Sequence, residues 1–263
     1  MIPKVIHYCW FGCNPKSDSV KKCIASWHKY CPGWKIKEWN EHNYDITKSA
    51  FMEEAYRAKR YAFVSDYARL DIIFNCGGVY LDTDVELFAS LDGWLNYEAF
   101  FVFETGRNIN TGMGFAACMG SPAVEKMLNF YNGRHYIENG REKIYPCPKN
   151  NTESFCDYCK EFRRNGETQV IGNSKVISLP EYSKIAKHHF TGTWGDDKEP
   201  RKSHGYHDTR WKRFIRKPSH FIFVEKHFGK KAIDIYTFYC YDLQEYGVKH
   251  FLKRMSKRGN EDG

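Results

Sequence analysis

Gly77-Gly78-Val79-Tyr80-Leu81-Asp82-Thr83-Asp84 is the stretch of this 263-residue chain that decides its fold and the position of its site. The two glycines end a preceding helix, and the apolar residues after them predict a short buried strand. Asp82 and Asp84 share one face, because side chains at positions i and i+2 of a strand point the same way. Two carboxylates with room for water suit Mg²⁺ or Mn²⁺, the ions that neutralise a diphosphate. The same Asp-x-Asp triplet also occurs in solvated turns, so the neighbouring sequence decides whether it indicates a metal site.

The segment before the glycines, 62–74, predicts an amphipathic helix. Its apolar stripe consists of Phe63, Tyr67, Leu70 and Phe74. Asp66 and Arg69, three residues apart, lie together beside this stripe. A surface ion pair at this place would contribute little. If this helix packs beside the end of the strand that carries Asp82 and Asp84, however, Asp66 can accept hydrogen bonds from ribose hydroxyls next to the cation site.

Strands and helices alternate along the chain. Strands are expected at 5–11, 34–39, 79–81 and 100–103, a further apolar run at 112–118, and helices at 17–30, 62–74 and in part of 43–60. This order predicts an α/β fold with a mixed, mostly parallel sheet flanked by helices. Ligands of such sheets bind beyond the carboxyl ends of the strands, where Trp10, Asp82 and Asp84 fall.

Residues 62–87, AFVSDYARLDIIFNCGGVYLDTDVEL, resemble the signature of family-32 glycosyltransferases, the sugar-binding region that contains a DXD motif. That group includes bacterial capsule and lipopolysaccharide sugar transferases and the fungal initiating mannosyltransferases. The glucosyltransferase domains of large clostridial toxins are more distant relatives. Residues 2–12 resemble the family's opening and residues 188–194 its closing motif, so three ordered blocks span roughly residues 1–195.

The resemblance implies a GT-A fold and a glycosyltransferase that moves a hexose, with retention at the anomeric carbon, from a nucleotide sugar to a glycan. A UDP-sugar is the favoured donor. The acceptor would be a glycan or a lipid-linked glycan in capsule, exopolysaccharide or lipopolysaccharide synthesis. We expect the catalytic domain at 1–200 and a basic, partly helical extension at 201–263.

The resemblance also implies roles for individual residues. Asp82 and Asp84 would hold Mn²⁺ or Mg²⁺. Arg69 would orient the donor sugar or phosphate, unless it only holds Asp66. Trp10 would stack an exposed indole on the nucleobase, with burial in the core as the alternative.

Two later segments offer further candidates. Asn110 would contact the donor sugar, although loop capping explains it almost as well, and Glu104 is a second candidate nearby. His189 is favoured over His188 as a third metal ligand. Trp194 would close on the diphosphate.

Composition agrees with a compact enzyme. Apolar residues make up 42% of the chain, and 19 Phe, 18 Tyr and 7 Trp supply a core. The mean hydropathy of −0.65 and the lack of a long apolar run predict no transmembrane helix. Without a visible signal peptide, the ten cysteines are expected to be reduced thiols of a cytoplasmic protein. A structural zinc site at the single C-x-x-C, Cys156 to Cys159, is the less favoured alternative.

The C-terminal segment carries most of the net charge of +8. Residues 201–231 hold ten Lys or Arg against two acidic residues, and residues 243–255 have the pattern of an amphipathic helix. Basic and apolar residues together suit an anionic membrane surface, which predicts peripheral attachment to the inner face of the cell membrane. A solvated face on an ordinary terminal helix is the alternative. We expect no nucleic-acid partner, since no nucleic-acid-binding motif accompanies the charge.

Two other functions remain open from the residues. A metal-dependent phosphohydrolase would also use Asp82 and Asp84, but it would normally need further ligands for a second ion or for activating water. A glycan-binding protein that has lost catalysis would not need to keep both aspartates.

Overall fold

The computed structural model describes residues 1–104 and 107–190. The predictions made for Trp194 and for the basic extension at 201–263 lie outside the described residues. Among the helices that are described, none is long and apolar enough to cross a membrane.

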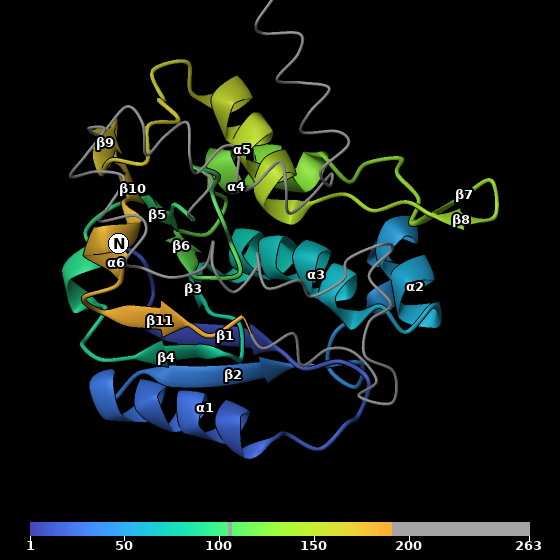
Figure 1. Ribbon diagram of the computed structural model, residues 1–263, viewed down its shortest axis with the longest axis horizontal. Coiled ribbons are helices and arrows are strands. Elements are labelled where there is room, and N and C mark those ends of the chain that lie inside the picture. The colour runs from blue at the N-terminus through green and yellow to red at the C-terminus, as the bar shows by residue number, and fades with distance from the viewer. Residues whose placement is uncertain (105–106, 191–263) are drawn as a thin grey trace, which may run out of the picture. The chain divides into compact units, whose positions relative to one another are not determined.

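A seven-stranded sheet forms the centre of the fold (Figure 1), with the strands in the order β2-β1-β3-β6-β5-β10-β9. Its strands are β1 (Val5–Cys9), β2 (Lys35–Trp39), β3 (Gly78–Tyr80), β5 (Ala99–Val102), β6 (Phe115–Ala117), β9 (Gln169–Ile171) and β10 (Ser174–Ile177). The sheet is mixed: β1 pairs in parallel with β2 and β3, and β10 with β5, whereas β6 and β9 pair antiparallel to their neighbours. Five strands therefore run in one direction, as predicted.

Two smaller ribbons accompany the sheet. Strand β4 (Val85–Leu87) pairs antiparallel with β11 (Ala186–His188), and β7 (Ile137–Glu138) with β8 (Arg141–Glu142). The sequence did not predict the first ribbon, whose two strands lie a hundred residues apart along the chain.

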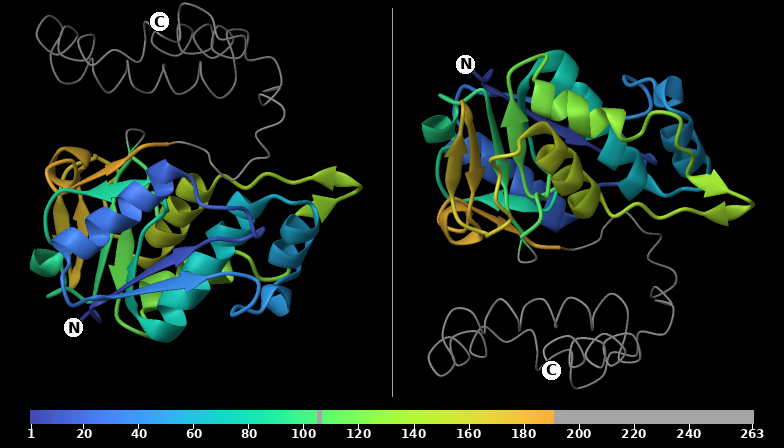
Figure 2. Two further views of the ribbon diagram at one scale, coloured as in Figure 1. Left: turned by 90° about the horizontal axis from the view of Figure 1, so that it is seen from below. Right: turned by 90° about the horizontal axis from the view of Figure 1, so that it is seen from above.

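Helices cover both faces of the sheet (Figure 2). They are α1 (Asp18–Tyr30), α2 (Ala50–Arg57), α3 (Tyr61–Cys76), α4 (Pro122–Asn129), α5 (Cys147–Tyr158) and the short α6 (Leu179–Tyr182), with 3-10 turns η1 (Ile46–Lys48) and η2 (Asp92–Trp94). Helices α2 to α5 contribute to one core with one face of the sheet. Helix α1, the β4–β11 ribbon and α6 contribute to the other. Successive side chains of a strand point to opposite faces, so one strand contributes to both cores. Phe100 faces the α1 side and Phe101 the α3 side.

The predicted helix and strand around the two glycines are both present, as α3 and β3. Gly77 and Gly78 have φ angles of 63° and 103°, which non-glycine residues rarely adopt. A Cβ atom on Gly78 would lie 2.9 Å from the backbone oxygen of Val5, so the chain can turn here only without a side chain. The helix is more deeply buried than a single apolar stripe predicts, because helices α2 and α4 cover the side that faces away from the sheet.

Candidate active site

The two aspartates lie in a turn that joins β3 to β4 at the carboxyl end of the parallel strands. The amide of Val85 donates to the carbonyl of Asp82 at 3.0 Å, so the residues form a tight turn and not the extended strand assumed from the sequence. The two carboxylates still converge, with ligand oxygens within 4.8 Å of each other. Side chains of α1 hold the following strand, since the indole of Trp27 donates to the carbonyl of Val85 at 2.8 Å.

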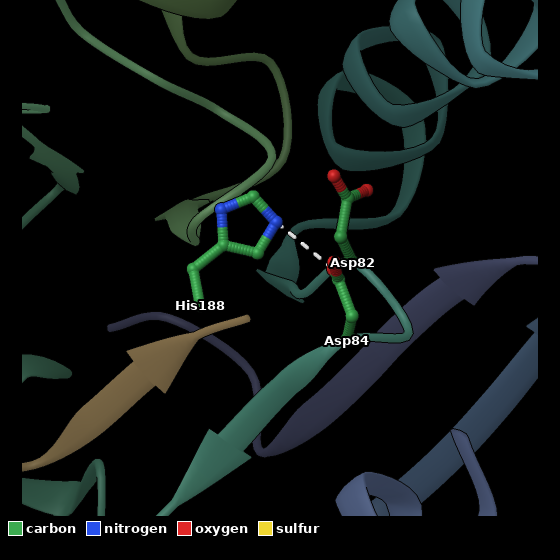
Figure 3. Close-up of side chains that lie close together, drawn as sticks. All are labelled: Asp82, Asp84 and His188. Atoms are coloured by element: carbon green, nitrogen blue, oxygen red, sulfur yellow. Dashed lines mark ion pairs between the residues drawn. The ribbon is translucent and has the colours of Figure 1, made fainter. Parts of the chain in front are cut away.

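His188 completes this group from the far end of the described chain. Pairing of β11 with β4 sets His188 opposite Val85, and Nε2 of His188 lies 2.9 Å from Oδ1 of Asp84 (Figure 3). One nitrogen of His188 and one oxygen each of Asp82 and Asp84 all lie within 4.8 Å of one another. Among the described residues, these three form the one cluster of His, Cys, Asp and Glu side chains with such spacing.

The sequence favoured His189 as the third ligand, but the structure brings His188 to the two carboxylates. Consecutive residues of a strand point to opposite faces. His189 therefore turns to Glu86, whose Oε2 lies 2.9 Å from its Nε2. The backbone amide of His189 donates to the carbonyl of Asp84 at 3.0 Å, which fixes the strand that carries His188.

Arg69 links helix α3 to the aspartate turn. Its Nη2 lies 3.0 Å from Oδ1 of Asp66 and 3.4 Å from Oδ1 of Asp82. Its Nε donates to the carbonyl of Ser65 at 3.0 Å. The hydroxyl of Tyr80 donates to the same oxygen of Asp82 at 3.0 Å. The side chain of Arg69 is only 6% exposed, so these contacts hold the guanidinium in one place.

Burial dominates the titration of the acidic residues. Burial raises the pKa of Asp66 to about 6, against the opposing effect of Arg69. The pKa of Asp82 is also raised, mainly by burial, while Arg69 and His188 act to lower it. When ionised, Asp66, Asp82 and Asp84 place three negative charges beside one permanent positive charge, that of Arg69. The electrostatics of this place therefore favour an added cation.

The residues present fit a divalent metal ion. Ligand atoms on one Mg²⁺-like ion at about 2.1 Å lie roughly 3 Å apart when adjacent, which matches the distance between His188 Nε2 and Asp84 Oδ1. Oxygen and imidazole donors suit Mn²⁺ and Mg²⁺. The other ring nitrogen of His188, Nδ1, is buried without a hydrogen-bond partner.

A loop from the neighbouring strand closes over Asp82. The amide of Asp82 donates to the carbonyl of Gly112 at 3.1 Å. A Cβ atom on Gly112 would collide with Oδ2 of Asp82 and lie 3.0 Å from Nη1 of Arg69, so the close approach requires glycine. Asn110 shapes this loop: its side-chain oxygen accepts from the amide of Gly112 at 2.8 Å, and its side-chain nitrogen donates to Glu104 at 2.9 Å. This is the loop-capping arrangement that the sequence offered as an alternative; a contact of Asn110 with a sugar stays a prediction.

Trp10 is buried, with 6% of its surface exposed, and not the exposed strand-end indole that the sequence suggested. The following loop covers it: its indole donates to the carbonyl of Asn14 at 2.7 Å, and Nζ of Lys16 lies 5.5 Å from the ring centroid. A contact of this ring with a nucleobase stays a prediction.

Sequence comparisons agree with this geometry. The family described as "Glycosyltransferase sugar-binding region containing DXD motif" matches residues 17–101, which include Asp66, Arg69, Asp82 and Asp84. An uncharacterized glycosyltransferase of Acanthamoeba polyphaga mimivirus is 29% identical over 181 residues, which cover 65% of this chain and 70% of that protein. The protein is a glycosyltransferase. The residues that match the family, 17–101, do not include His188, and the fold brings this third member of the cluster to the two aspartates.

Two solved structures are similar to this glycosyltransferase in part. The PaToxG glycosyltransferase is 17% identical, with a TM-score of 0.46 over 60% of this chain and 69% of that one. A glycosyltransferase involved in the glycosylation of the major capsid of PBCV-1 is 14% identical, with a TM-score of 0.39 over 72% and 94% of the two chains.

Sequence reasoning missed two residues of the site. The sequence pattern predicts Tyr80 only as part of the buried strand, yet its hydroxyl holds Asp82. It predicts Gly112 as the start of an apolar run, yet this glycine makes room for the same carboxylate. The signal for Tyr80 was available, since strand alternation sets it on the face opposite Val79 and toward helix α3.

Proposed function

We propose that this glycosyltransferase is metal-dependent and transfers a hexose from a nucleotide sugar, with a UDP-hexose favoured, to a glycan acceptor. The observation that carries the proposal is the cluster of Asp82, Asp84 and His188 beside the fixed guanidinium of Arg69. Mn²⁺ or Mg²⁺ bound there supplies positive charge next to a departing diphosphate.

The protein's own residues position the donor. Arg69 is held in advance by Ser65, Asp66 and Asp82, so it orients a phosphate or the donor sugar without rearranging. Preorganised charges of this kind stabilise a charged leaving group more than mobile ones do. Asp66 accepts hydrogen bonds from ribose hydroxyls.

The sequence blocks that resemble family-32 enzymes support three finer assignments. These are retention at the anomeric carbon, membership of family 32, and a role in capsule, exopolysaccharide or lipopolysaccharide synthesis. With such a role, the acceptor is a glycan or a lipid-linked glycan, and the basic segment 201–258 holds the enzyme at an anionic membrane surface. A nucleobase contact at Trp10 and a closing role for Trp194 belong to the same proposal.

Incubation with a panel of UDP-, GDP- and CMP-sugars in Mn²⁺, without acceptor, tests the reaction class. A glycosyltransferase cleaves the bond between the anomeric carbon and oxygen of a UDP- or GDP-sugar, which releases an intact nucleoside diphosphate. In ¹⁸O-labelled water the label then enters the sugar. We expect this outcome by ³¹P NMR and mass spectrometry, together with loss of the reaction in Asp84→Asn.

The phosphohydrolase alternative gives a different product from the same incubation. It cleaves within the diphosphate, which yields a nucleoside monophosphate and a sugar phosphate, with the label in phosphate. That product pattern would contradict the proposal. His189→Gln is the matched control, since His189 is the neighbouring histidine and contacts Glu86 instead of the aspartates. Its activity should stay within about twofold of wild type.

A further inference from the structure

Phe190 is a large apolar residue that remains in solvent at the edge of the candidate active site. It follows strand β11 directly, and 66% of its surface is exposed. Its ring centroid lies 4.1 Å from that of His188, with the ring planes at 48°. Single exposed apolar residues are common, so exposure alone assigns no role.

The backbone at Phe190 adds an independent observation. Its φ angle is 52°, in the left-handed region that costs a non-glycine residue free energy. Such conformations persist where the surroundings over-determine them, and they gather at functional sites. The two residues before Phe190 are both held in place, since His188 contacts Asp84 and His189 contacts both Glu86 and the backbone of Asp84.

The site has a buried polar end and an open apolar end. The side chains of Arg69 and Asp66 are 6% and 13% exposed, and both residues belong to helix α3. Arg69 contacts Asp82, whereas Phe190 lies beside His188, the residue that contacts Asp84, and is exposed. A charged group such as a phosphate gains no hydrogen bond from Phe190. The exposed ring of Phe190 is therefore open to contact with an apolar face of a substrate beside the cluster.

We propose that Phe190 is the platform on which a pyranose ring of the acceptor glycan rests, a proposal that builds on the proposed function. One face of a glucose- or galactose-type ring presents several C–H groups with partial positive charge, and the face of an aromatic ring carries negative charge. The contact is apolar and planar, and it sets the angle of the acceptor sugar while its hydroxyl approaches the donor. Phe190 therefore contributes to acceptor binding and to the choice among acceptor sugars.

Steady-state kinetics of Phe190→Leu and Phe190→Trp test the proposal. Methyl β-D-glucopyranoside and methyl β-D-galactopyranoside serve as acceptors with the donor that the wild type accepts. Phe190→Leu keeps an apolar side chain but loses the aromatic face, so the acceptor KM should rise about fivefold to tenfold. Phe190→Trp should restore it to within about twofold of wild type, and the donor KM should not change in either variant.

Phe88→Leu is the matched control. Phe88 is also exposed, at 41%, and follows the partner strand β4, but its backbone pairs with Ile185 at the opposite end of the ribbon from His188. Its acceptor and donor KM should stay at the wild-type values. A rise in donor KM for Phe190→Leu would show that the ring contacts the nucleotide sugar and would overturn the proposal, as would a wild-type acceptor KM.

A binding measurement separates this proposal from the proposed function. 4-Fluorophenylalanine placed at position 190 of the full chain reports contacts of the ring by ¹⁹F NMR. Its resonance should shift when either methyl glycoside is added and should not shift with UDP and Mg²⁺, a diamagnetic ion that leaves a nearby fluorine signal sharp. If the wild type cleaves no nucleotide sugar but the resonance shifts with the glycosides, the proposed function fails and the sugar platform stands. A resonance that ignores both glycosides refutes the platform whatever the enzyme's activity.

Discussion

The guanidinium of Arg69 lies 3.4 Å from Oδ1 of Asp82 and joins helix α3 to the aspartate turn. The side chain of Arg69 is buried and that of Asp82 is 13% exposed, and Asp66 lies 3.0 Å from the same guanidinium nitrogen. A helix residue thus sets the position of a carboxylate at the end of a strand. Stability and activity are therefore coupled at this one side chain.

Removal of the positive charge at Arg69 should lower both the stability of the fold and the activity. In Arg69→Met the carboxylates of Asp66 and Asp82, each only 13% exposed, lose their partner, which destabilises a fold by about 3 kcal/mol. Urea unfolding measures this loss, and nucleotide-sugar cleavage should disappear. The control is Arg60→Met, because Arg60 pairs with Glu142 at 2.9 Å in a largely exposed position. That change should cost less than about 1 kcal/mol. Equal stability of the two variants would contradict the account of the Arg69 cluster.

Gly112→Ala should weaken metal binding with little loss of stability. The new methyl group would press on Oδ2 of Asp82 and so displace the carboxylate. We expect the Kd for Mn²⁺, measured by electron paramagnetic resonance, to rise at least about tenfold, the equivalent of about 1.4 kcal/mol. Gly93→Ala is the control, since a Cβ atom there meets nothing within 4 Å. Unchanged Mn²⁺ affinity in Gly112→Ala would show that the loop does not constrain Asp82.

His7 should make the fold sensitive to acid. Its Nδ1 accepts from the indole of Trp39 at 3.0 Å, and its Nε2 lies 3.1 Å from the carbonyl of Gly77. Burial lowers the pKa of His7 to about 4 from 6.5. Between these values the unfolded chain binds a proton that the native protein does not. The free energy of unfolding should therefore fall as the pH drops from about 6.5 to about 4, by up to about 3 kcal/mol from this residue.

Comparison with His7→Gln isolates this contribution. Glutamine does not titrate, so the difference in unfolding free energy between wild type and variant should shrink as the pH is lowered through that window. Urea melts at pH 7.5, 6, 5 and 4.5 measure it. A difference that stays constant with pH would show that His7 does not titrate on unfolding.

The basic segment 201–258 should bind anionic membranes. Each basic residue near such a surface contributes about 1 kcal/mol, screened by salt. Co-sedimentation of the full chain should require phosphatidylserine or phosphatidylglycerol in the liposomes and should fall at high salt. It should also fail when Lys249, Lys253 and Arg254 become Glu. Equal pelleting with neutral liposomes would instead favour an ordinary terminal helix.

Local patterns in the sequence predicted the core of this fold well. The helix before the two glycines, the buried strand after them and the order of the first strands follow from periodicity and from glycine, and all are present. The meeting of Asp66 and Arg69 with Asp82 follows from the same pattern, because a helix that ends at a glycine pair must pack beside the strand it leads into.

The features that the sequence could not predict depend on contacts between residues far apart along the chain or on the path of loops. Whether His188 or His189 reaches Asp84 depends on the register of β11 against β4, and a shift of one residue exchanges the two side chains. The burial of Trp10 depends on where the loop around Asn14 and Lys16 folds back. The capping role of Asn110 depends on the turn that leads into β6.

Titration of UDP, GDP and CMP into the full chain, with Mn²⁺ and with EDTA, tests the central claim that Asp82, Asp84 and His188 hold a divalent ion for the donor diphosphate. Isothermal calorimetry should show that UDP binds in Mn²⁺ and not in EDTA. Asp84→Asn and His188→Gln should weaken that binding by at least about tenfold, or about 1.4 kcal/mol, and His189→Gln should not. Nucleotide binding of equal strength in EDTA, or a loss caused by His189→Gln and not by His188→Gln, would contradict the account.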